Sequence, residues 1–401
     1  MGLGAAGRGG IIRGPVTWYC YLLLGFFTYI LNIQGNIVPF LKDELSLSYA
    51  AVSLHSAALA VGMIAVGLFG AWFVARSGRR RAFALGAAGC ALGAILLCAA
   101  PAAWASILSC GLIGLFGALL ASMAPAVLAE KHGPGRDIAL AELSATCYAF
   151  GILAPLAASA AIVVDVGWRG AVLAGAAIGL VILAAFARTP VPDPPALSRD
   201  DASGRLPPAY WVYWCVMALC VSLEFCVLLW SPAFLGSVVG LEAALAAAGA
   251  AAFSLAVLLG RLVTTGLVRK VSTGSIYVVA MLIVLAGFAV YWTAHGAVPA
   301  LGALFLLGIG IAPLYALTAG FCLAAAGRLS TTGSSRLMLA VGTALLIVPP
   351  LLGSIADHVG LRSAHLILPV LAVAAMVLFG LGRHLERRAG TASSLPRSAA
   401  A

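Results

Sequence analysis

The sequence predicts an all-α membrane protein with twelve transmembrane helices in two six-helix halves. Three observations support this fold class. First, 63% of the 401 residues are hydrophobic and only 9% are charged, whereas soluble domains carry about 25% charged residues, so lipid must solvate much of the surface. Second, apolar runs long enough to cross a bilayer recur along the whole chain. Third, only one long hydrophilic stretch interrupts them.

The apolar runs are each about 20 residues or longer, the length that crosses the hydrocarbon core. The first run is too long for the apolar region of a signal peptide, and no small-residue cleavage pattern follows it, so it is predicted to be the first span. The twelve predicted spans are 17–41, 49–75, 82–100, 102–129, 139–164, 170–187, 209–235, 243–268, 276–294, 298–326, 336–356 and 363–382.

The long hydrophilic stretch is RTPVPDPPALSRDDASGRLPP, residues 188–208. Its prolines and acidic residues do not continue an apolar helix, so it is predicted to be a cytoplasmic linker. The chain then divides into a six-helix half at 1–187, the linker at 188–208, and a six-helix half with a terminal tail at 209–401.

Basic residues are distributed unevenly between the two sets of loops. If the chain begins in the cytoplasm, the outer loops hold only Lys42, Arg169 and Arg362. The positive-inside rule then predicts that both termini are cytoplasmic, which agrees with an even number of spans. The protein is expected to be a multi-pass protein of the cell (cytoplasmic or inner) membrane. The inner segments hold Arg8, Arg13, Arg76, Arg79, Arg80, Arg81, Lys131, Arg136, Arg188, Arg199, Arg205, Arg269, Lys270, Arg328, Arg336, Arg383, Arg387, Arg388 and Arg397.

The two halves share landmarks at one spacing of 193 residues. Each match is weak by itself, but all occur in the same order and at corresponding span ends, which indicates two halves repeated in the same orientation. The matching pairs are Trp18 with Trp211, Pro39 with Pro232, Gly67 with Gly260, Arg76 with Arg269, and Arg169 with Arg362.

The loop after the second span carries a known motif. Its sequence, GAWFVARSGRRR at residues 70–81, resembles the loop between helices two and three of the major facilitator superfamily (MFS). The motif is a glycine, a short apolar stretch, Asp-Arg, one residue, and then Gly-Arg-Arg or Gly-Arg-Lys. Arg76, Gly78, Arg79 and Arg80 match its second part. With the spans and the linker, the resemblance covers essentially the whole chain and implies the MFS fold.

A weaker copy of the motif, GLVRKVSTG with Arg269, follows the eighth span. The chain departs from the family at Ala75 and Val268, which replace the acidic residue before each arginine. The resemblance implies that this acid latches the cytoplasmic side when the transporter opens outward, so the present protein must latch differently or more loosely. We predict that the arginine loop gates transport, and the alternative is that its arginines serve only to hold topology.

Glu224 is the acidic residue deepest within a predicted span. It stands about halfway along the seventh span, in CVSLEFCVLLWSP, whereas the other twelve acidic residues lie in loops or near helix ends. An ionised carboxylate at this depth is costly and needs a partner or a water-filled cavity. Glu224 is therefore predicted to bind a proton or substrate; the alternative is a protonated carboxyl that hydrogen-bonds to a neighbouring helix.

Two further groups of polar residues are predicted to line a cavity near the middle of the membrane. Tyr29, Asn32 and Asn36 share one face of the first span, and Tyr315 and Thr318 share a face of the tenth. Adding 193 to Asn32 gives a neighbour of Glu224, which places both at similar depth. Such polar faces also hold helices together, so the tenth-span pair has a structural alternative.

Other polar residues are assigned structural roles. Arg261 lies a little over two turns from the end of its span, from which it can snorkel to the surface. His55 is interpreted as a packing residue, with a proton relay as the alternative. Glu130, Arg136 and Glu142 flank the loop after the fourth span and are predicted to form a cytoplasmic charge network.

The predicted function is a proton-coupled secondary transporter that moves a small organic solute by alternating access. Gly151 and Pro155 match a fifth-helix signature that the resemblance associates with proton-coupled exporters, which favours efflux of a drug or metabolite. The alternative is uptake of a sugar or organic acid. No nucleotide-binding motif is present, which argues against ATP-driven transport. An intramembrane enzyme or a scaffold is the least supported alternative, because the histidines are scattered.

The cysteines indicate neither a disulfide framework nor a metal site. All nine lie within apolar runs and none has metal-ligand spacing, so they are interpreted as packing residues. We therefore expect no metal and no cofactor. The expected partners are a small-molecule substrate, protons and the lipid bilayer, with no nucleic acid, and the protein is expected to work as a monomer.

Overall fold

A computed structural model of the protein describes residues 11–192 and 205–393. Within these ranges every regular element is a helix, and no strand is found. Linker residues 193–204 and three of the predicted inner basic residues, Arg8, Arg199 and Arg397, lie outside the described part of the chain. The predicted all-helical fold class is confirmed.

Twelve helical segments of the described chain are long and apolar enough to cross a membrane, which confirms the predicted number of spans. The tenth span comprises two helices, and so does the twelfth. The helices are α1 Pro15–Glu44, α2 Tyr49–Ser77, α3 Arg79–Ala99, α4 Ala103–His132, α5 Arg136–Val163, α6 Gly167–Ala185, α7 Pro208–Ser237, α8 Ala243–Leu267, α9 Thr273–Thr293, α10 Ala297–Ile311, α11 Leu314–Ala326, α12 Ser330–Val359, α13 Leu361–Ala364 and α14 Ile367–Ser393, with one-turn helices η1 Gly133–Gly135 and η2 Gly327–Leu329.

Local sequence explains several helix boundaries. Pro15 and Pro208 occupy the first helical positions of α1 and α7, where the missing N–H has no intrahelical partner to lose. Gly78 separates α2 from α3 with a φ of 80°, a left-handed conformation that favours glycine. Pro313 precedes α11 and interrupts the tenth span after Ile311 because proline lacks the donor that would continue the helix.

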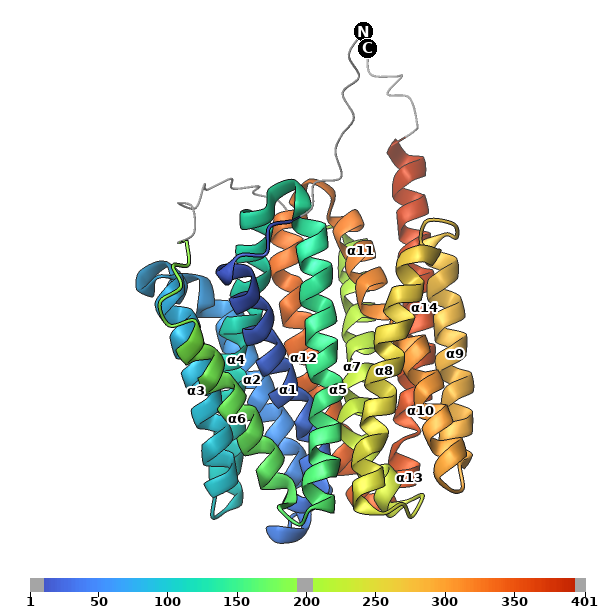
Figure 1. The fold of residues 1–401 in the computed structure, drawn as a ribbon. Helices are drawn as coiled ribbons and strands as arrows, with labels where there is room; N and C mark the ends of the chain where they lie inside the picture. The colour runs from blue at the N-terminus through green and yellow to red at the C-terminus, as the bar shows by residue number, and fades with distance from the viewer. Residues whose placement is uncertain (1–10, 193–204, 394–401) are drawn as a thin grey trace, which may run out of the picture.

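The helices form one bundle, and α1 begins at the end of the bundle where α14 finishes (Figure 1). Helices α1–α6 lie mainly on one side of the view, and α8, α9, α10 and α14 lie on the other. Helices of the first six pack against later helices at three places: α2 packs against α12, α5 packs against α8, and α1 crosses α7. We call the end where α1 begins the Pro15 end, and the end where α1 finishes the Glu44 end; α14 finishes at the Pro15 end.

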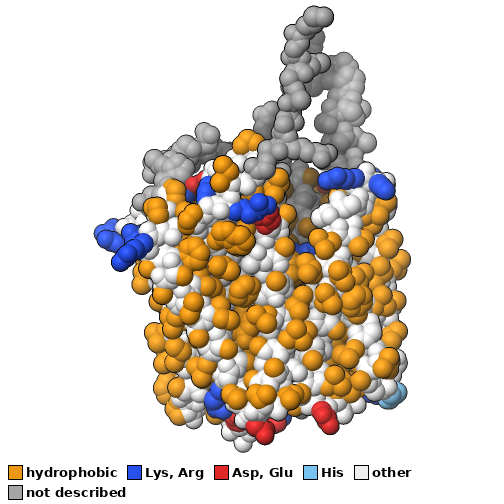
Figure 2. All heavy atoms as spheres, in the orientation of Figure 1, with side chains coloured by type: hydrophobic (Ala, Val, Ile, Leu, Met, Phe, Trp, Pro, Cys, Tyr) orange, Lys and Arg blue, Asp and Glu red, His pale blue; other side chains and the backbone are white. Residues whose placement is uncertain are grey.

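The outer surface of the bundle is apolar. In Figure 2 hydrophobic side chains cover the sides of the bundle, and charged side chains gather toward its two ends. Large apolar residues on these sides are more than half exposed, among them Phe69, Trp72, Val181 and Val377. Such a band is stable only against lipid, so the protein is a multi-pass membrane protein.

The predicted orientation can be tested by labelling introduced cysteines with a membrane-impermeant thiol reagent. Of the nine native cysteines only Cys215 is exposed, so a Cys215→Ser background is suitable. We expect outside labelling in the loops at 45–48 and 164–166 and no outside labelling at position 78. Labelling of Gly78→Cys from outside would reverse the predicted orientation.

Candidate functional site

A cavity of about 440 Å³ lies between α1, α5, α7 and α8, and we call it the central cavity. It begins near Glu224 in the middle of α7 and continues toward the Pro15 end, where its lining includes Leu140 in the first turn or so of α5. Most of the lining is apolar. Its polar members are Thr28, Asn32, Ser144, Tyr148, Glu224, Ser254, Arg261 and Tyr315.

Glu224 and Arg261 form an ion pair in this cavity. A terminal guanidinium nitrogen of Arg261 lies 3.8 Å from Oε1 of Glu224, and the two side chains are 28% and 24% exposed, respectively. The guanidinium also lies over the ring of Tyr148, at 4.8 Å from the ring centroid, a distance at which a cation is attracted to the ring face. Both charges are therefore accessible to a solute in the cavity.

The position of Arg261 corrects the sequence prediction. It does not extend to the surface as a purely structural residue but lines the central cavity beside Glu224. The sequence contained a signal for this arrangement, because an ionisable residue within a span is expected to have a partner. Arg261 lies within α8 and Glu224 within the preceding helix, so their pairing could have been proposed.

Asn32 reaches the central cavity as predicted from the 193-residue spacing. It lines the same cavity as Glu224, and its Nδ2 donates a hydrogen bond to the carbonyl oxygen of Thr28 at 2.9 Å. Gly151 of α5 lies beside it, and a Cβ at Gly151 would stand 3.6 Å from the Asn32 amide. Gly151 thus forms cavity wall, whereas Pro155 lies one turn farther along α5.

Two predicted cavity residues lie elsewhere. Tyr29 is buried and donates a hydrogen bond to the carbonyl oxygen of Ala171 at 2.8 Å, because α6 packs against that side of α1. Thr318 is buried and donates to the carbonyl oxygen of Leu314 within its own helix at 2.6 Å. Its neighbour Tyr315 does line the cavity. Helical spacing identified the shared faces but not the helices that cover them.

Asn36 lines a second cavity instead of the central one. This second cavity, of about 370 Å³, lies at the Glu44 end between α1, the start of α2, α7 and α8. Lys42 and Asp43 also line it, and Nζ of Lys42 lies 4.7 Å from the ring centroid of Tyr49. Because Asn32 and Asn36 are one turn apart on α1, the two cavities follow one another along this helix.

A close crossing of α1 and α7 separates the two cavities. A Cβ on Gly35 would stand 2.3 Å from the carbonyl oxygen of Leu228 and 2.9 Å from Cα of Leu229. Only a glycine allows the backbones to approach this closely. This crossing, which we call the waist, closes the central cavity toward the Glu44 end.

A second contact closes the Glu44 end between α2 and α12. The carboxylate of Asp357 in α12 accepts hydrogen bonds from the backbone N–H groups of Tyr49 at 2.6 Å and Ala50 at 2.8 Å. These N–H groups belong to the first turn of α2, which has no intrahelical acceptors for them. Asp357 thus caps α2, although it lies 307 residues from Ala50 and 308 residues from Tyr49 in the sequence.

Asp357→Ala should weaken closure at the Glu44 end without preventing folding. Loss of a helix-capping side chain costs about 0.5–2 kcal/mol, which corresponds to a change of about 2- to 30-fold in the equilibrium between closed and open states. The check is the rate at which an impermeant thiol reagent labels Ser53→Cys, beside the α2–α12 contact. A rate equal to that of the Asp357-containing parent would contradict the role of this cap.

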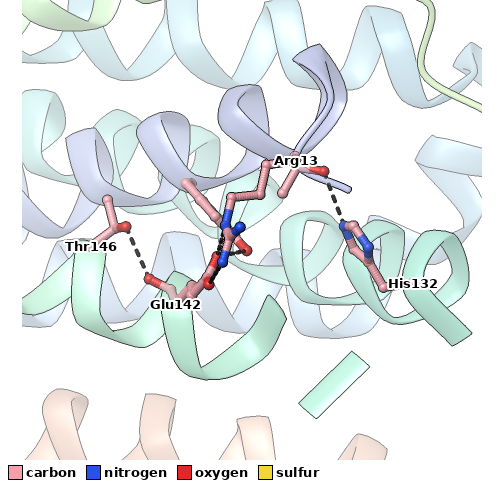
Figure 3. Close-up of polar contacts among 6 residues, drawn as sticks. Arg13, His132, Glu142 and Thr146 are labelled. Carbon is pink, nitrogen blue, oxygen red and sulfur yellow. Dashed lines mark hydrogen bonds and ion pairs between the residues drawn. The ribbon is translucent and has the colours of Figure 1, made fainter. Parts of the chain in front are cut away.

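Charged residues at the Pro15 end fasten α1 to α5 (Figure 3). The guanidinium of Arg13 donates to both carboxylate oxygens of Glu142, at 3.0 and 2.5 Å. Tyr21 donates to Oε2 of Glu142 at 3.1 Å. The hydroxyl of Thr17 lies 3.0 Å from Nε2 of His132, which ties α1 to α4 as well.

The arginine loop is attached to α4. Arg79 is buried and donates to both carboxylate oxygens of Glu130, at 2.5 and 2.7 Å. Arg80 donates to the carbonyl oxygen of Ala187 at 2.7 Å, just beyond α6. Of the residues predicted to form a charge network, Glu130 is bound to this loop and Glu142 to Arg13, and Arg136 is the first residue of α5. The second copy, Arg269, lies in the turn between α8 and α9.

Arg76 provides a test of gating by the arginine loop. It is exposed at the end of α2, so its replacement by Ala should leave folding and substrate binding intact. If the loop gates, Arg76→Ala slows transport, because a contact made in another conformation is lost. Arg81→Ala is the matched control, since Arg81 is also exposed but lies outside the matched motif positions. Equal transport by both variants would favour a purely topological role.

His55 has the contacts of a packing residue. It is buried between α2 and α4, its Nδ1 lies 2.7 Å from the carbonyl oxygen of Val52, and its Nε2 lies 2.8 Å from the hydroxyl of Ser106. Both ring nitrogens are therefore satisfied locally. In the described part of the chain no group of histidine, cysteine and acidic residues could hold a metal ion.

A bundle of membrane-length helices around a mostly apolar cavity that holds one ion pair is the architecture of a membrane transporter. Residues 17–335 match the family model of the Major Facilitator Superfamily. This match covers most of the chain, and the protein belongs to that superfamily. It is accordingly a transporter rather than an enzyme. A search of curated protein sequences finds no significant match.

Solved transporter structures share the fold at low sequence identity. A bacterial homologue of the human lysosomal transporter Spinster, inward-facing and occupied, is 15% identical over 94% of this chain and 98% of that chain, with a TM-score of 0.77. The unoccupied form of that homologue is also 15% identical, over 92% of this chain and 96% of that chain, with a TM-score of 0.76. A mutant of the nucleoside transporter NupG is 11% identical over 92% of this chain and 99% of that chain, with a TM-score of 0.75.

Proposed function

We propose that the protein is a proton-coupled secondary transporter that moves a small organic solute across the cell membrane by alternating access. In this proposal residues 1–187 and 209–401 form the two six-helix halves, and the Pro15 end faces the cytoplasm. The central cavity is the substrate site, and it is open toward the cytoplasm in this conformation. The single observation that carries the proposal is the Glu224–Arg261 ion pair inside that cavity.

The ion pair supports proton coupling for a simple electrostatic reason. A carboxylate within a membrane span is stable as an ion only with a partner or water, and Glu224 has both Arg261 and access to the cavity. When the cavity closes, Glu224 loses its contact with water and keeps only Arg261 as a partner. Alternating access therefore supplies the change of environment that proton uptake and release require.

The contacts that close the Glu44 end support alternating access. The waist at Gly35 and the cap at Asp357 both join helices of the first half to helices of the second. Both must separate before the central cavity can open to the other side. The waist lies between the central and second cavities, so its opening would join them into one path along α1 and α7.

The two candidate directions of transport differ in how the proton and solute interact. Efflux by proton exchange, the direction predicted from Gly151 and Pro155, requires the proton and the solute to compete for the site. Uptake requires them to bind together. The geometry favours binding together, because protonation of Glu224 removes the partner of Arg261 and leaves that cation available to a solute.

The experiment that tests this function begins with purified protein and a panel of drugs, sugars and organic acids. Ligands that bind the folded state raise the melting temperature by mass action. Each stabilising compound is then assayed for movement into proteoliposomes with and without an imposed pH gradient. We expect accumulation that requires the gradient and is abolished by a protonophore. Movement that only equilibrates, whatever the gradient, would show facilitated diffusion and refute proton coupling.

A further inference from the structure

The two charges in the central cavity differ in how they can be neutralised. Glu224 can take up a proton, but the guanidinium of Arg261 stays charged at every pH that a cell experiences. With Glu224 ionised the pair is neutral. With Glu224 protonated the same cavity carries one positive charge, and only an anion can restore neutrality.

Arg261 also has hydrogen-bonding capacity that the described residues do not use. Its Nε is buried and has no hydrogen-bond partner among them. Its terminal nitrogen lies 3.8 Å from Glu224, beyond the range of a good hydrogen bond. A guanidinium offers five N–H donors in a planar fork that fits a carboxylate. The Arg261 side chain is 28% exposed and lines the cavity, so a carboxylate there could accept from its terminal nitrogens.

The remaining walls restrict the occupant further. Apart from Glu224 and Arg261, the cavity is lined by no Asp, Glu, Lys, Arg or His among the described residues. Tyr148 and Cys147 of α5 and Tyr315 of α11 are the other ionisable groups there, and their phenol and thiol groups stay neutral near pH 7. Arg261 therefore supplies the one fixed positive charge of the cavity, which matches a ligand with one negative charge.

Apolar side chains form much of the remaining surface. Leu24, Leu31, Leu228, Phe253 and Val257 line the cavity from α1, α7 and α8. They suit a hydrocarbon or aromatic body attached to the charged group. The volume of about 440 Å³ lies within the range of about 300–1,000 Å³ that is typical of sites for small molecules.

We infer that the substrate is an amphiphilic monocarboxylate whose carboxylate binds Arg261 when Glu224 is protonated, so that one proton and one anion are carried together. This inference rests on the proposed function and deepens it by naming the substrate class and the coupling rule. Protonation and anion binding stabilise each other, because each makes the other electrostatically favourable. The same argument disfavours a cation, which would add a positive charge to a cavity that is neutral with Glu224 ionised and already positive with Glu224 protonated.

The test measures binding to the purified full-length protein, without transport. Benzoate is the probe, benzamide is its neutral isostere, benzyltrimethylammonium is a cation of similar size, and phthalate carries a second carboxylate. We expect benzoate to raise the melting temperature and the other three to do so much less. Benzoate affinity should increase by up to about tenfold for each pH unit of acidification wherever Glu224 is ionised in the free protein.

Variants at Arg261 identify the binding group. Arg261→Gln should weaken benzoate binding by at least about 30-fold, the loss typical when one partner of a buried charge pair is removed. Arg261→Lys keeps the charge but loses the fork, so it should bind benzoate more weakly than the parent and more tightly than Arg261→Gln. The Lys variant also guards against loss of folding in the Gln variant.

The outcomes separate this inference from the proposed function. Equal stabilisation by benzoate and benzamide, preference for the cation, or equal binding of phthalate would overturn the monocarboxylate class even if pH-driven transport of another solute were observed. Benzoate binding that depends on Arg261 and on pH would support the class even if reconstituted transport failed to respond to a pH gradient. In that case the proposed proton-coupled transport would be refuted, but the monocarboxylate class would still be supported.

Discussion

Glu224→Gln should abolish proton-driven accumulation of the substrate while leaving a folded protein that still binds it. Glutamine keeps the shape and much of the hydrogen-bonding capacity of glutamate but cannot take up a proton. Arg261 then lacks a counter-charge in the empty cavity at every pH. Substrate binding should become insensitive to pH, because the group whose titration controlled Arg261 has been removed.

The expected size of this effect follows from the driving force. One unit of pH gradient supplies about 1.4 kcal/mol, or about tenfold accumulation for a solute carried with one proton. In Glu224→Gln this factor should fall to one, while exchange of labelled for unlabelled substrate continues. The measurements are pH-driven uptake and counterflow in the same proteoliposomes.

Glu242→Gln is the matched control for the Glu224 variant. Glu242 is exposed just before the first residue of α8 and lines neither the central nor the second cavity, so its replacement should leave pH-driven uptake unchanged. Unchanged pH-driven uptake by folded Glu224→Gln protein would refute the coupling role. Glu224 would then be a carboxyl that serves packing, the alternative that the sequence left open.

Sequence reasoning succeeded where the internal repeat indicated how deep a residue lies in the membrane. The spacing of 193 residues related Asn32 to the neighbour of Glu224, and the structure places both residues on the wall of one cavity. A repeat gives this information because equivalent helices cross the membrane at equivalent heights. The twelve spans followed from the lengths of the apolar runs alone, because few polar groups are stable on a helix that lipid surrounds.

The same reasoning failed where the neighbours of a helix mattered. Tyr29 shares a face with Asn32 in sequence, but α6 covers the side of α1 on which its hydroxyl finds an acceptor. A periodic pattern identifies the face of a helix and not the helix that packs against it. The sequence interpretation of Arg261 rested only on its depth in the span. The free-energy cost of its charge in the membrane also depends on its distance from Glu224.

Asp357 illustrates a contact that no local pattern predicts. It lies near the end of a span, where acidic residues are common and carry no special signal. Its carboxylate accepts hydrogen bonds from the backbone N–H groups of Tyr49 and Ala50, more than 300 residues away in the sequence. Only the packing of α12 against α2 brings them together.

The waist gives the second large expected effect: Gly35→Ala should make closure at the Glu44 end much less favourable. The added Cβ would meet the backbone of α7 at 2.3 Å from the carbonyl oxygen of Leu228. A backbone atom cannot move aside as a flexible side chain can, so α1 and α7 must separate. Overpacking of this kind costs about 1–3 kcal/mol, which shifts the equilibrium between closed and open states by about 5- to 150-fold.

Because transport requires both states, Gly35→Ala should lower its rate by a similar factor. An Asn32→Cys probe in the central cavity should at the same time be labelled faster by an impermeant thiol reagent added at the Glu44 side. Gly320→Ala is the matched control, since Gly320 lies within α11 and a Cβ there would meet nothing within 4 Å. Normal transport and unchanged labelling in a folded Gly35→Ala protein would show that the waist tolerates separation and does not control access, leaving the Asp357 cap as the remaining closure at that end.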